Sequence, residues 1–424
     1  WLAVMLGGYA VAALATVDEC SYSKDIIELA LERTRIMAGH VGDDGAWEEG
    51  PFYWGGIAFL LMFFHIIDSL PRSSTGLMKM DRLEKTALFP IYMNMPPCGR
   101  ANFSDAHYYQ DHNASYLFSL MAASCKNTYY QWAFHEFREV APESIPELKK
   151  IEINDFRSPE ETFQFLVYDQ NVNPHPPDLP LFKVFQGKAY GFLASRSGFG
   201  RSDTGLVICA NGGTNGTNHH QLDIGQIIMA YNRFNFISDP GYGRAFFLPD
   251  GSKINRQNYF AKSSMGHNIV TINGNNQIDS PEARGIIRNC VSNNAMDLFE
   301  IEMSSAYSQC SFAVRMVKRL KKADVVEIDD YFNLDSALPI RLAWFYRGHA
   351  EIIDGSTVKI TSAAGICRLT IDSDVEFRLS SDSYSEKGFM DRNNQPLPPE
   401  EYPFIKIEAM PSKKHHLKTT FYFS

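Results

Sequence analysis

NHHQLDIG (218–225), ISDPGYG (237–243) and SMGHNIVTING (264–274) lie within the stretch that decides the fold, residues 211–277. Between these polar motifs the chain has apolar segments of strand length. Residues 224–230 and 234–237 are separated by a Tyr-Asn-Arg turn and predict an antiparallel hairpin. Residues 268–272 predict a further strand. The stretch therefore predicts β-structure with polar side chains gathered at the strand ends.

Three polar positions in this stretch predict a metal site. The hairpin would carry the cluster of His219, His220 and Gln221 to the same end of the sheet as Asp239, and a strand beginning after His267 would add an imidazole. Two nitrogens and a carboxylate oxygen at one point form a ligand set of the zinc type. Alternatively, the aspartate before Pro-Gly caps its own turn, and each histidine is a hydrogen-bonded residue at a strand end.

Composition limits the class of protein. The 424 residues suffice for two to three domains, and 45% apolar with 21% charged residues is typical of a globular chain. A net charge of −9 argues against nucleic acid as a partner. It is compatible with an anionic polysaccharide, which a local basic cleft can bind. The seven cysteines form no CxxC pair and no metal-ligand spacing.

The first third of the chain predicts helices. Apolar residues at helical spacing occur at 2–17, 23–38, 55–70, 112–123 and 129–139. Gly7 and Gly8 in the first of these would let a neighbouring helix approach closely. Pairs of amphipathic helices joined by short loops predict an antiparallel helical array, a toroid or solenoid.

The chain begins at Trp1 within an apolar run. Residues 1–16 lack the basic region of a signal peptide and continue into an acidic helical segment, so we interpret them as a core helix. We expect a processed or truncated chain. The apolar run 57–67 is too short to span a bilayer, and no other run predicts a membrane span.

Residues 141–181 are rich in proline and predict a linker or crossing segment. From residue 182 the pattern changes to many short strands with Gly, Asn and Asp turns, including 182–196, 325–332 and 341–346. We therefore predict an α+β multidomain chain. Its parts are a helical domain (1–140), a linker (141–181) and a large antiparallel β-sandwich (182–424).

The loop DDGAWEEGPFYW (43–54) precedes the apolar helix 55–70 and is a candidate site at the mouth of the helical array. Tyr53 would lie at the helix N-terminus, where the dipole favours a phenolate able to take and return a proton. Glu49 and Trp54 would contact substrate. The alternative interpretation is that these aromatic residues are packing at a helix start.

A second polar, aromatic segment, NFSDAHYYQDHN (102–113), could line a sugar cleft. Its candidate substrate contacts are Asn102, His107 and His112. A hydrated loop with helix capping explains the same residues equally well.

Five motifs together resemble the heparinase II/III-like family of polysaccharide lyases, which includes oligoalginate lyases. They are the three motifs quoted first, GGYAVAALA (7–15) and DGAWEEGPFYWGG (44–56). The resemblance implies an incomplete (α/α) toroid followed by an antiparallel β-sandwich. It also implies β-elimination on a uronic acid, and a periplasmic or secreted location.

The resemblance also implies roles for individual residues. Tyr53 matches the catalytic tyrosine, and His219 matches an active-site base or substrate contact. Tyr242 and Tyr259 lie where a second active-site tyrosine could come from. The residues that neutralise the substrate carboxylate would precede Trp1.

The zinc ion of the family implies a further set of residues. Asp239 and His267 match two of its ligands, while the third position, a histidine in the family, is Gln221. A neutral amide oxygen binds zinc more weakly than an imidazole does. Asp239 and His267 could instead simply hydrogen-bond to each other.

Two other functions remain open at this point. A glycoside hydrolase would need two carboxylates about 5 to 10 Å apart, and Asp43, Asp44, Glu48 and Glu49 are candidates. A catalytically impaired glycan-binding protein would be consistent with Gln221.

Overall fold

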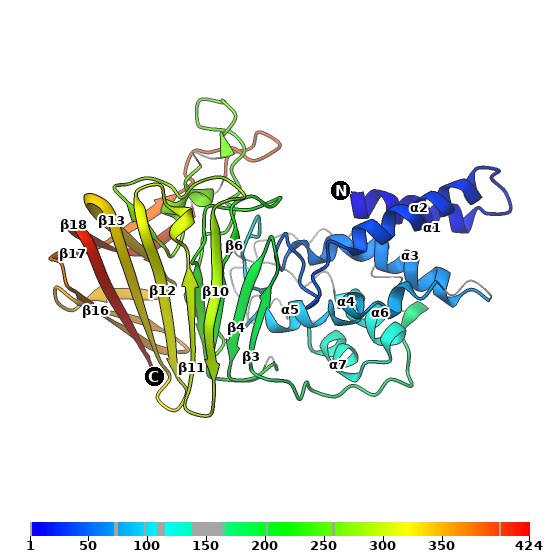
Figure 1. Ribbon diagram of the computed structural model, residues 1–424, viewed down its shortest axis with the longest axis horizontal. Helices are drawn as coiled ribbons and strands as arrows, with labels where there is room; N and C mark the ends of the chain where they lie inside the picture. Colours follow the sequence, from blue (N-terminus) through cyan, green and yellow to red (C-terminus); the bar gives the residue numbers. More distant parts are fainter. Residues whose placement is uncertain are drawn as a thin grey trace.

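The computed structural model describes residues 2–71, 75–96, 99–107, 115–137, 163, 166–200, 202–256, 259–397 and 400–424. The helices form one end of the molecule and the β-sheets the other, as Figure 1 shows. Among the described residues, every helix is too short or too polar to be a candidate membrane span.

The helical part follows the predicted order. Its elements are α1 (Leu2–Ala15), α2 (Ser23–Ala38), η1 (Tyr53–Ile57), α3 (Ala58–Ser69), η2 (Leu77–Lys79), α4 (Asp81–Lys85), α5 (Leu88–Tyr92), α6 (Ser115–Cys125) and α7 (Thr128–Phe137). α1 packs against α2 and α3, and α6 packs against α7 (Figure 1). The prediction for 23–38 is confirmed, whereas the segment predicted as one helix at 55–70 is divided into η1 and α3. The incomplete (α/α) toroid stays a prediction.

α1 is a helix as predicted, and one of its faces contributes to the core of the helical part. It buries Ala3, Gly7, Ala10 and Ala13, while Tyr9 on its other side is 61% exposed. A Cβ atom at Gly7 would lie 2.5 Å from the backbone carbon of Phe59. Gly7 therefore allows the close approach of α1 to α3 that the Gly-Gly pair predicts.

The strands and the short helices between them occupy the rest of the chain. They are β1 (Asn94–Met95), β2 (Gly99–Arg100), β3 (Phe182–Gln186), β4 (Gly191–Arg196), β5 (Leu206–Asn211), β6 (Gly213–Thr214), β7 (Ile227–Tyr231), β8 (Phe234–Ile237), η6 (Phe260–Lys262), η7 (Ser264–Gly266), β9 (Val270–Ile272), β10 (Arg284–Ser292), β11 (Met296–Glu302), η8 (Ser304–Ala306), β12 (Cys310–Leu320), β13 (Val325–Phe345), β14 (His349–Ile352), β15 (Thr357–Ser362), β16 (Gly365–Ser373), β17 (Phe377–Ser385) and β18 (Glu401–Phe423).

Within the described residues, two antiparallel sheets pack face to face. The smaller has the order β3-β4-β5-β7-β8, and the larger runs from β14 through β18, β13 and β12 to β6. One core cluster joins the inner faces of both sheets, for example Ile208 and Met229 with Phe299 and Trp344. The β-sandwich interpretation agrees with this arrangement.

The smaller sheet is covered on both faces. Its second face packs against the helices, where Phe185 and Phe192 contact Phe89 of α5. Every residue of β4 and β5 is consequently buried, so these strands show no polar and apolar alternation. The molecule thus has three layers, namely helices, small sheet and large sheet, and Figure 1 shows β3 and β4 beside α5.

The predicted hairpin is confirmed. β7 and β8 pair antiparallel, and the two residues of the turn, Asn232 and Arg233, both have positive φ, 46° and 67°. Positive φ at both central positions is the geometry of a type I′ turn, whose twist matches that of the flanking strands. The segment 182–196 is two strands, and the predicted strands 325–332 and 341–346 are parts of one long strand, β13, which ends at Phe345. The predicted linker at 141–181 lies mainly outside the described residues.

A buried ion pair connects the large sheet to the stretch 211–277. Arg315 of β12 makes two hydrogen bonds to Asp330 of β13, of 2.7 and 2.9 Å. Its Nη1 also donates to the carbonyl oxygens of Gly225 (2.8 Å) and Asn268 (2.6 Å). Because a buried guanidinium needs all these acceptors, Arg315 fixes the backbone on both sides of the candidate site.

Candidate active site

Tyr53 and His219 lie face to face where the helical part meets the sandwich. Their rings are 3.9 Å apart at an interplanar angle of 17°, and both side chains are partly exposed. Tyr53 begins η1, and His219 belongs to the turn before β7. The structure therefore brings together the two residues that the sequence assigns to acid and base chemistry.

The loop that carries Tyr53 is held at several points. The carboxylate of Asp44 accepts hydrogen bonds from Gln186 N (2.8 Å) and Tyr190 Oη (2.7 Å) of the small sheet. Arg100 Nη1 donates to the carbonyl oxygen of Pro51, 2.9 Å away. Gly50 has φ +93°, and a Cβ atom there would lie 2.7 Å from Ser104 Oγ. Only glycine meets both requirements at this position.

His219 has an unusual backbone. Its φ is +60°, a conformation that few residues other than glycine and asparagine adopt. The carbonyl oxygen of His219 accepts a hydrogen bond of 3.0 Å from Asp105 N, which links this turn to the helical part. Such conformations persist where surrounding contacts hold them, often at functional sites.

Asp105 lies behind His219 at the centre of a polar cluster. Its carboxylate contacts His219 Nδ1 (3.4 Å), Arg256 Nη1 (2.6 Å) and Lys262 Nζ (3.5 Å), and it accepts a weak hydrogen bond from Gln221 Nε2 (3.4 Å). Burial alone would raise the pKa of Asp105, but the hydrogen bonds from His219 and Arg256 and the charge of Lys262 hold it well below its ordinary value. The ionised carboxylate can orient the imidazole and stabilise its protonated form.

The phenol of Tyr53 favours the protonated form. Burial, followed by the negative charge of Asp105, raises its pKa to about 12. The expectation of a phenolate at a helix N-terminus is therefore wrong. Tyr53 starts the short helix η1 rather than α3, and a helix dipole acts only within its first turn. At neutral pH this side chain can donate a proton.

His107 and Tyr242 form a second ring pair in the same region. Their centroids are 4.4 Å apart, and Lys262 Nζ lies 4.7 Å from the Tyr242 ring. Burial and the charges of Arg244 and Lys262 lower the pKa of His107 to about 4. His107 is therefore neutral at pH 7, and both rings remain candidates for contacts with a sugar.

Asp239 and His267 are joined directly. His267 Nδ1 donates to Asp239 Oδ2 over 2.7 Å, and the same oxygen accepts from Gln226 Nε2 at 2.5 Å. The other oxygen accepts from Gly241 N at 2.7 Å. Burial alone would lower the pKa of His267, but the charge and hydrogen bond of Asp239 raise it. The alternative of a hydrogen-bonded pair agrees with this geometry.

Of the three residues predicted as zinc ligands, Asp239 and His267 contact each other, and Gln221 contacts Asp105. The amide of Gln221 points to Asp105, and both oxygens of Asp239 already accept hydrogen bonds from the protein. The buried Nε2 of His267 is one of the side-chain atoms that have no hydrogen-bond partner among the described residues. That part of the chain contains no group of three His, Cys, Asp or Glu that could hold a metal ion. Zinc binding stays a prediction of the resemblance, and metal analysis of the purified protein checks it.

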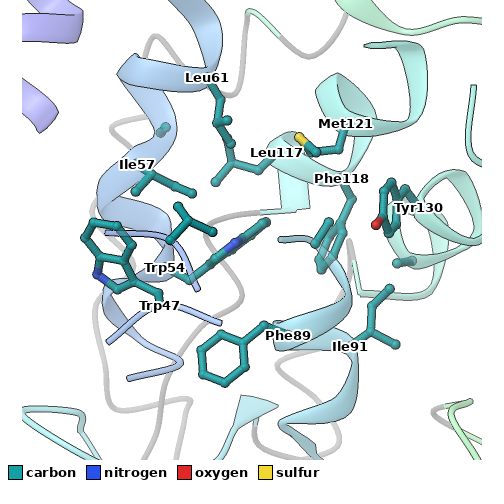
Figure 2. Close-up of a cluster of buried hydrophobic side chains, with 14 of the residues drawn as sticks. Trp47, Trp54, Ile57, Leu61, Phe89, Ile91, Leu117, Phe118, Met121 and Tyr130 are labelled. Atoms are coloured by element: carbon teal, nitrogen blue, oxygen red, sulfur yellow. The ribbon is translucent and has the colours of Figure 1, made fainter. Parts of the chain in front are cut away.

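Trp54 is a core residue. It has no exposed surface, its Nε1 donates to Thr86 Oγ1 over 3.0 Å, and its ring lies 5.4 Å from that of Phe118. Figure 2 shows it enclosed by side chains of α3, α5 and α6. The interpretation as aromatic packing therefore describes Trp54, and we do not retain it as a substrate contact.

The other candidates differ in position. Tyr259 is buried, and its hydroxyl accepts a hydrogen bond from Ala245 N (3.4 Å) rather than contacting Tyr53. Asn102 is also buried and donates to the carbonyl oxygen of Asp239, so it holds the backbone at that residue. Glu49 is partly exposed, and its charge contributes to the raised pKa of Tyr53. His112 lies outside the described residues.

Three of the four carboxylates considered for hydrolysis make local contacts. Asp43 pairs with Arg82, Asp44 accepts from Tyr190, and Glu48 contacts His40. These contacts hold the 43–54 loop together. Glu49, the fourth, is among the charges that raise the pKa of Tyr53.

The sequence analysis missed the cations of the site. Arg256 and Lys262 precede His267 in the chain and both contact Asp105. A signal exists in retrospect, since these are basic residues within the stretch 211–277 of an acidic chain. Their convergence on Asp105 depends on tertiary structure that local patterns do not encode.

No family model and no curated protein matches the sequence. Among solved structures, a crystal structure of heparinase III matches with a TM-score of 0.73 and 14% identity, over 99% of this chain and 60% of that one. A heparan sulfate lyase, HepC from Pedobacter heparinus, matches with a TM-score of 0.69 and 14% identity, over 99% of this chain and 59% of that one. This chain thus spans about three-fifths of their length. At this level of identity the similarity shows that the chain shares their fold.

Proposed function

We propose that this protein is a polysaccharide lyase that cleaves a uronic-acid-containing glycan by β-elimination. The observation that carries the proposal is the Tyr53–His219 stack, with the carboxylate of Asp105 facing His219 Nδ1 at 3.4 Å. It lies where the helical part meets the sandwich. The shared fold with heparinase III and heparan sulfate lyase supports the same reaction class.

The reaction needs a base and an acid. The base removes the C5 proton of the uronate, and the acid protonates the departing oxygen at C4. Asp105 holds Nδ1 of His219, which leaves Nε2 as the basic nitrogen that can face the sugar. Tyr53 carries its proton at neutral pH and is placed beside that ring, so we assign it as the acid.

The C5 proton becomes acidic only when the neighbouring carboxylate is neutralised. The resemblance assigns this task to residues before Trp1. The proposal therefore concerns the full-length protein, and its test uses that protein.

Oligosaccharides of alginate, heparan and chondroitin provide the test. We expect full-length protein to release an unsaturated uronate from at least one of them. The absorbance of this product measures the rate. Tyr53→Phe should lower the rate about 10²–10⁴-fold, because the acid is removed. Tyr22→Phe, at an exposed position of the helical part, is the matched control and should leave the rate unchanged.

The absence of an unsaturated product from every uronate polymer would overturn the proposal. Release of reducing sugar without an unsaturated end would identify a glycoside hydrolase instead.

A catalytically impaired glycan-binding protein is the second candidate. The observation in its favour is Gln221, which stands at a position that the resemblance gives to histidine and is turned toward Asp105. Tight binding of oligosaccharide by the full-length protein with no turnover would support this candidate.

We also propose that the protein acts outside the cytoplasm, in the periplasm or as a secreted protein. Extracellular glycans too large to cross a membrane would be the substrates. Fractionation of cells that produce the full-length protein tests this location, and recovery in the cytoplasm alone would contradict it.

A further inference from the structure

Two loops of the sandwich pair with each other beside the candidate site. They are residues 243–256, between β8 and η6, and residues 386–397, between β17 and β18. Phe247 and Met390 form an antiparallel bridge, in which Met390 N donates to the carbonyl oxygen of Phe247 over 3.0 Å. Phe246 N donates to the carbonyl oxygen of Met390, 2.8 Å away. Figure 1 shows the two loops projecting together from the sandwich, one in green and one in orange. We call this pairing the loop junction.

The first of these loops is attached to the candidate site at both ends. Tyr242 comes directly before it and donates through its backbone to the carbonyl oxygen of Ala106, 3.0 Å away. Arg256 ends the loop and contacts Asp105 over 2.6 Å. A movement of the loop junction would therefore act on the Tyr242 ring and on the cluster around Asp105.

Glu386 is buried at the base of the loop junction. The residue is 1% exposed. Its Oε2 accepts a hydrogen bond of 3.1 Å from Arg244 N, whereas its Oε1 has no hydrogen-bond partner among the described residues. The two loops touch closely here, since a Cβ atom at Gly243 would lie 2.4 Å from that Oε1. The guanidinium of Arg244 pairs with Glu400 at a more exposed place.

This position suits a neutral carboxyl better than an ionised one. A buried carboxylate needs donors at both oxygens, and the described residues supply one backbone N–H. Burial raises the pKa of Glu386 to about 7, although the hydrogen bond and the charge of Arg244 act against it.

The groups around Glu386 that carry charge or can titrate come from both loops and from β18. They are Arg244, Glu400, Tyr242, Tyr259 and Tyr402. Burial raises the pKa of Tyr242 and of Tyr402, so both phenols stay neutral between pH 6 and pH 8. Over this range the carboxyl of Glu386 is therefore the group whose charge changes in their midst.

We propose that the protonation of Glu386 controls the loop junction. The two loops stay paired while this carboxyl is neutral, and the junction opens more often once the carboxyl has lost its proton. The loop that joins Tyr242 to Arg256 is then less firmly held at higher pH.

The direction of the effect follows from linkage. Opening the junction brings Glu386 into water, where its pKa returns to the ordinary value of about 4.3. Because the closed junction raises that pKa to about 7, the closed form is favoured at low pH. The equilibrium constant for opening therefore increases with pH between these two values and becomes constant at higher pH.

Hydrogen–deuterium exchange of the full-length protein at pH 6 and pH 8 tests the proposal. Each rate is divided by the intrinsic exchange rate at that pH, so that only the opening equilibrium remains. The amides of Phe246 and Met390 report on the loop junction, because their hydrogen bonds cross it. The amides of β12, inside the large sheet, are the reference.

We expect the corrected exchange of these two amides to be about tenfold faster at pH 8 than at pH 6, and that of β12 to be unchanged. Glu386→Gln keeps a neutral side chain of the same shape and should abolish the increase. Glu376→Gln, at an exposed carboxyl just before β17, is the matched control and should retain it.

Equal corrected exchange at both pH values in the unaltered protein would overturn the proposal. So would an increase that persists in Glu386→Gln, that disappears in Glu376→Gln, or that occurs equally in β12. If Glu386→Gln does not fold, the comparison of the loop junction with β12 in the unaltered protein decides alone. The measurement needs no turnover, so its result does not depend on the proposed function.

Discussion

Asp105 is the residue on which the chemistry of the candidate site depends. It faces His219, binds Arg256 and Lys262, and donates through its backbone to the carbonyl oxygen of His219. One side chain thus fixes the imidazole and balances the nearby cations. Tyr53 and Trp54 are adjacent in sequence but differ in burial. One is partly exposed against His219, and the other is fully buried.

Substitution of Asp105 by asparagine should separate its electrostatic role from its shape. We expect kcat/KM to fall about 100-fold or more at neutral pH, since His219 loses the negative charge that supports its protonated form. Steady-state kinetics on a uronate oligosaccharide measures this effect. A fall of less than threefold would mean that Asp105 only holds the loop.

The same substitution should change acid stability. The pKa of Asp105 is held low in the folded protein, so its contribution to stability is present above the ordinary pKa of an aspartate, about 3.9, and is lost as the pH falls. In urea unfolding between pH 7 and pH 3, the stability of Asp105→Asn should decline less steeply with falling pH. An unchanged slope would contradict this linkage.

The protonation state of Tyr53 predicts a pH profile. Its pKa is about 12, raised by burial and by Asp105, so the acid form persists well above the ordinary value of about 10. We expect kcat/KM to show no fall that is caused by ionisation of Tyr53 up to pH 10. A rate that increases with an apparent pKa near 10 would show that the phenolate is the active form.

Among the elements, the strand ends of the small sheet position the polar residues below the site. Asn268, just before β9, donates to the carbonyl oxygens of Ile227 (2.9 Å) and Ser238 (2.7 Å) and accepts from Phe345 N (2.7 Å). It therefore joins β7, β8 and β13 at one point. Gln226 connects the Asp239–His267 pair to this network, because its side chain hydrogen-bonds to both Asp239 and Asn268 N.

Removal of the Asn268 side chain should destabilise the fold. Asn268→Ala removes the partner of three buried backbone groups, each worth about 1–3 kcal/mol, so we expect a loss of about 3 kcal/mol or more in the free energy of unfolding. Denaturant unfolding measures it. Asn333→Ala is the control at an exposed position and should cost less than about 0.5 kcal/mol.

How far the sequence predicts an element depends on whether its pattern is local. α2 and the β7–β8 hairpin follow from apolar spacing and turn residues. β13 continues through Pro339 because its irregular pairing with β18 there tolerates the missing N–H, which the pattern alone does not reveal. Tyr53 and His219 follow from motifs, whereas Arg256 and Lys262 follow only from tertiary contacts.

At the scale of the whole molecule, the small sheet couples the two halves. One of its faces packs on the large sheet and the other on the helices, so the Tyr53 loop and the His219 turn are held across it. Arg315 anchors this arrangement from the large sheet, since it donates to both Gly225 and Asn268.

Substitution of Arg315 alone should destabilise the fold more than substitution of Arg315 and Asp330 together. Arg315→Met leaves Asp330 buried and without its cation, and we expect a loss of about 3–5 kcal/mol in the free energy of unfolding. Arg315→Met combined with Asp330→Leu should recover part of it, because the two apolar groups need no partner, whereas the carbonyl oxygens of Gly225 and Asn268 still lack the donor. Denaturant unfolding of both variants measures the difference, and a double variant as unstable as the single one would contradict this account.

The central claim is that Tyr53 and His219 act together as acid and base in a β-elimination. The rate of unsaturated uronate formation by the full-length protein tests it most directly, compared with Tyr53→Phe, His219→Gln and the double variant. We predict that each single substitution lowers the rate about 10²–10⁴-fold and that the double substitution costs little more than either, because the two residues serve one step. Cleavage that yields no unsaturated product, or that persists in both single variants, would contradict the claim.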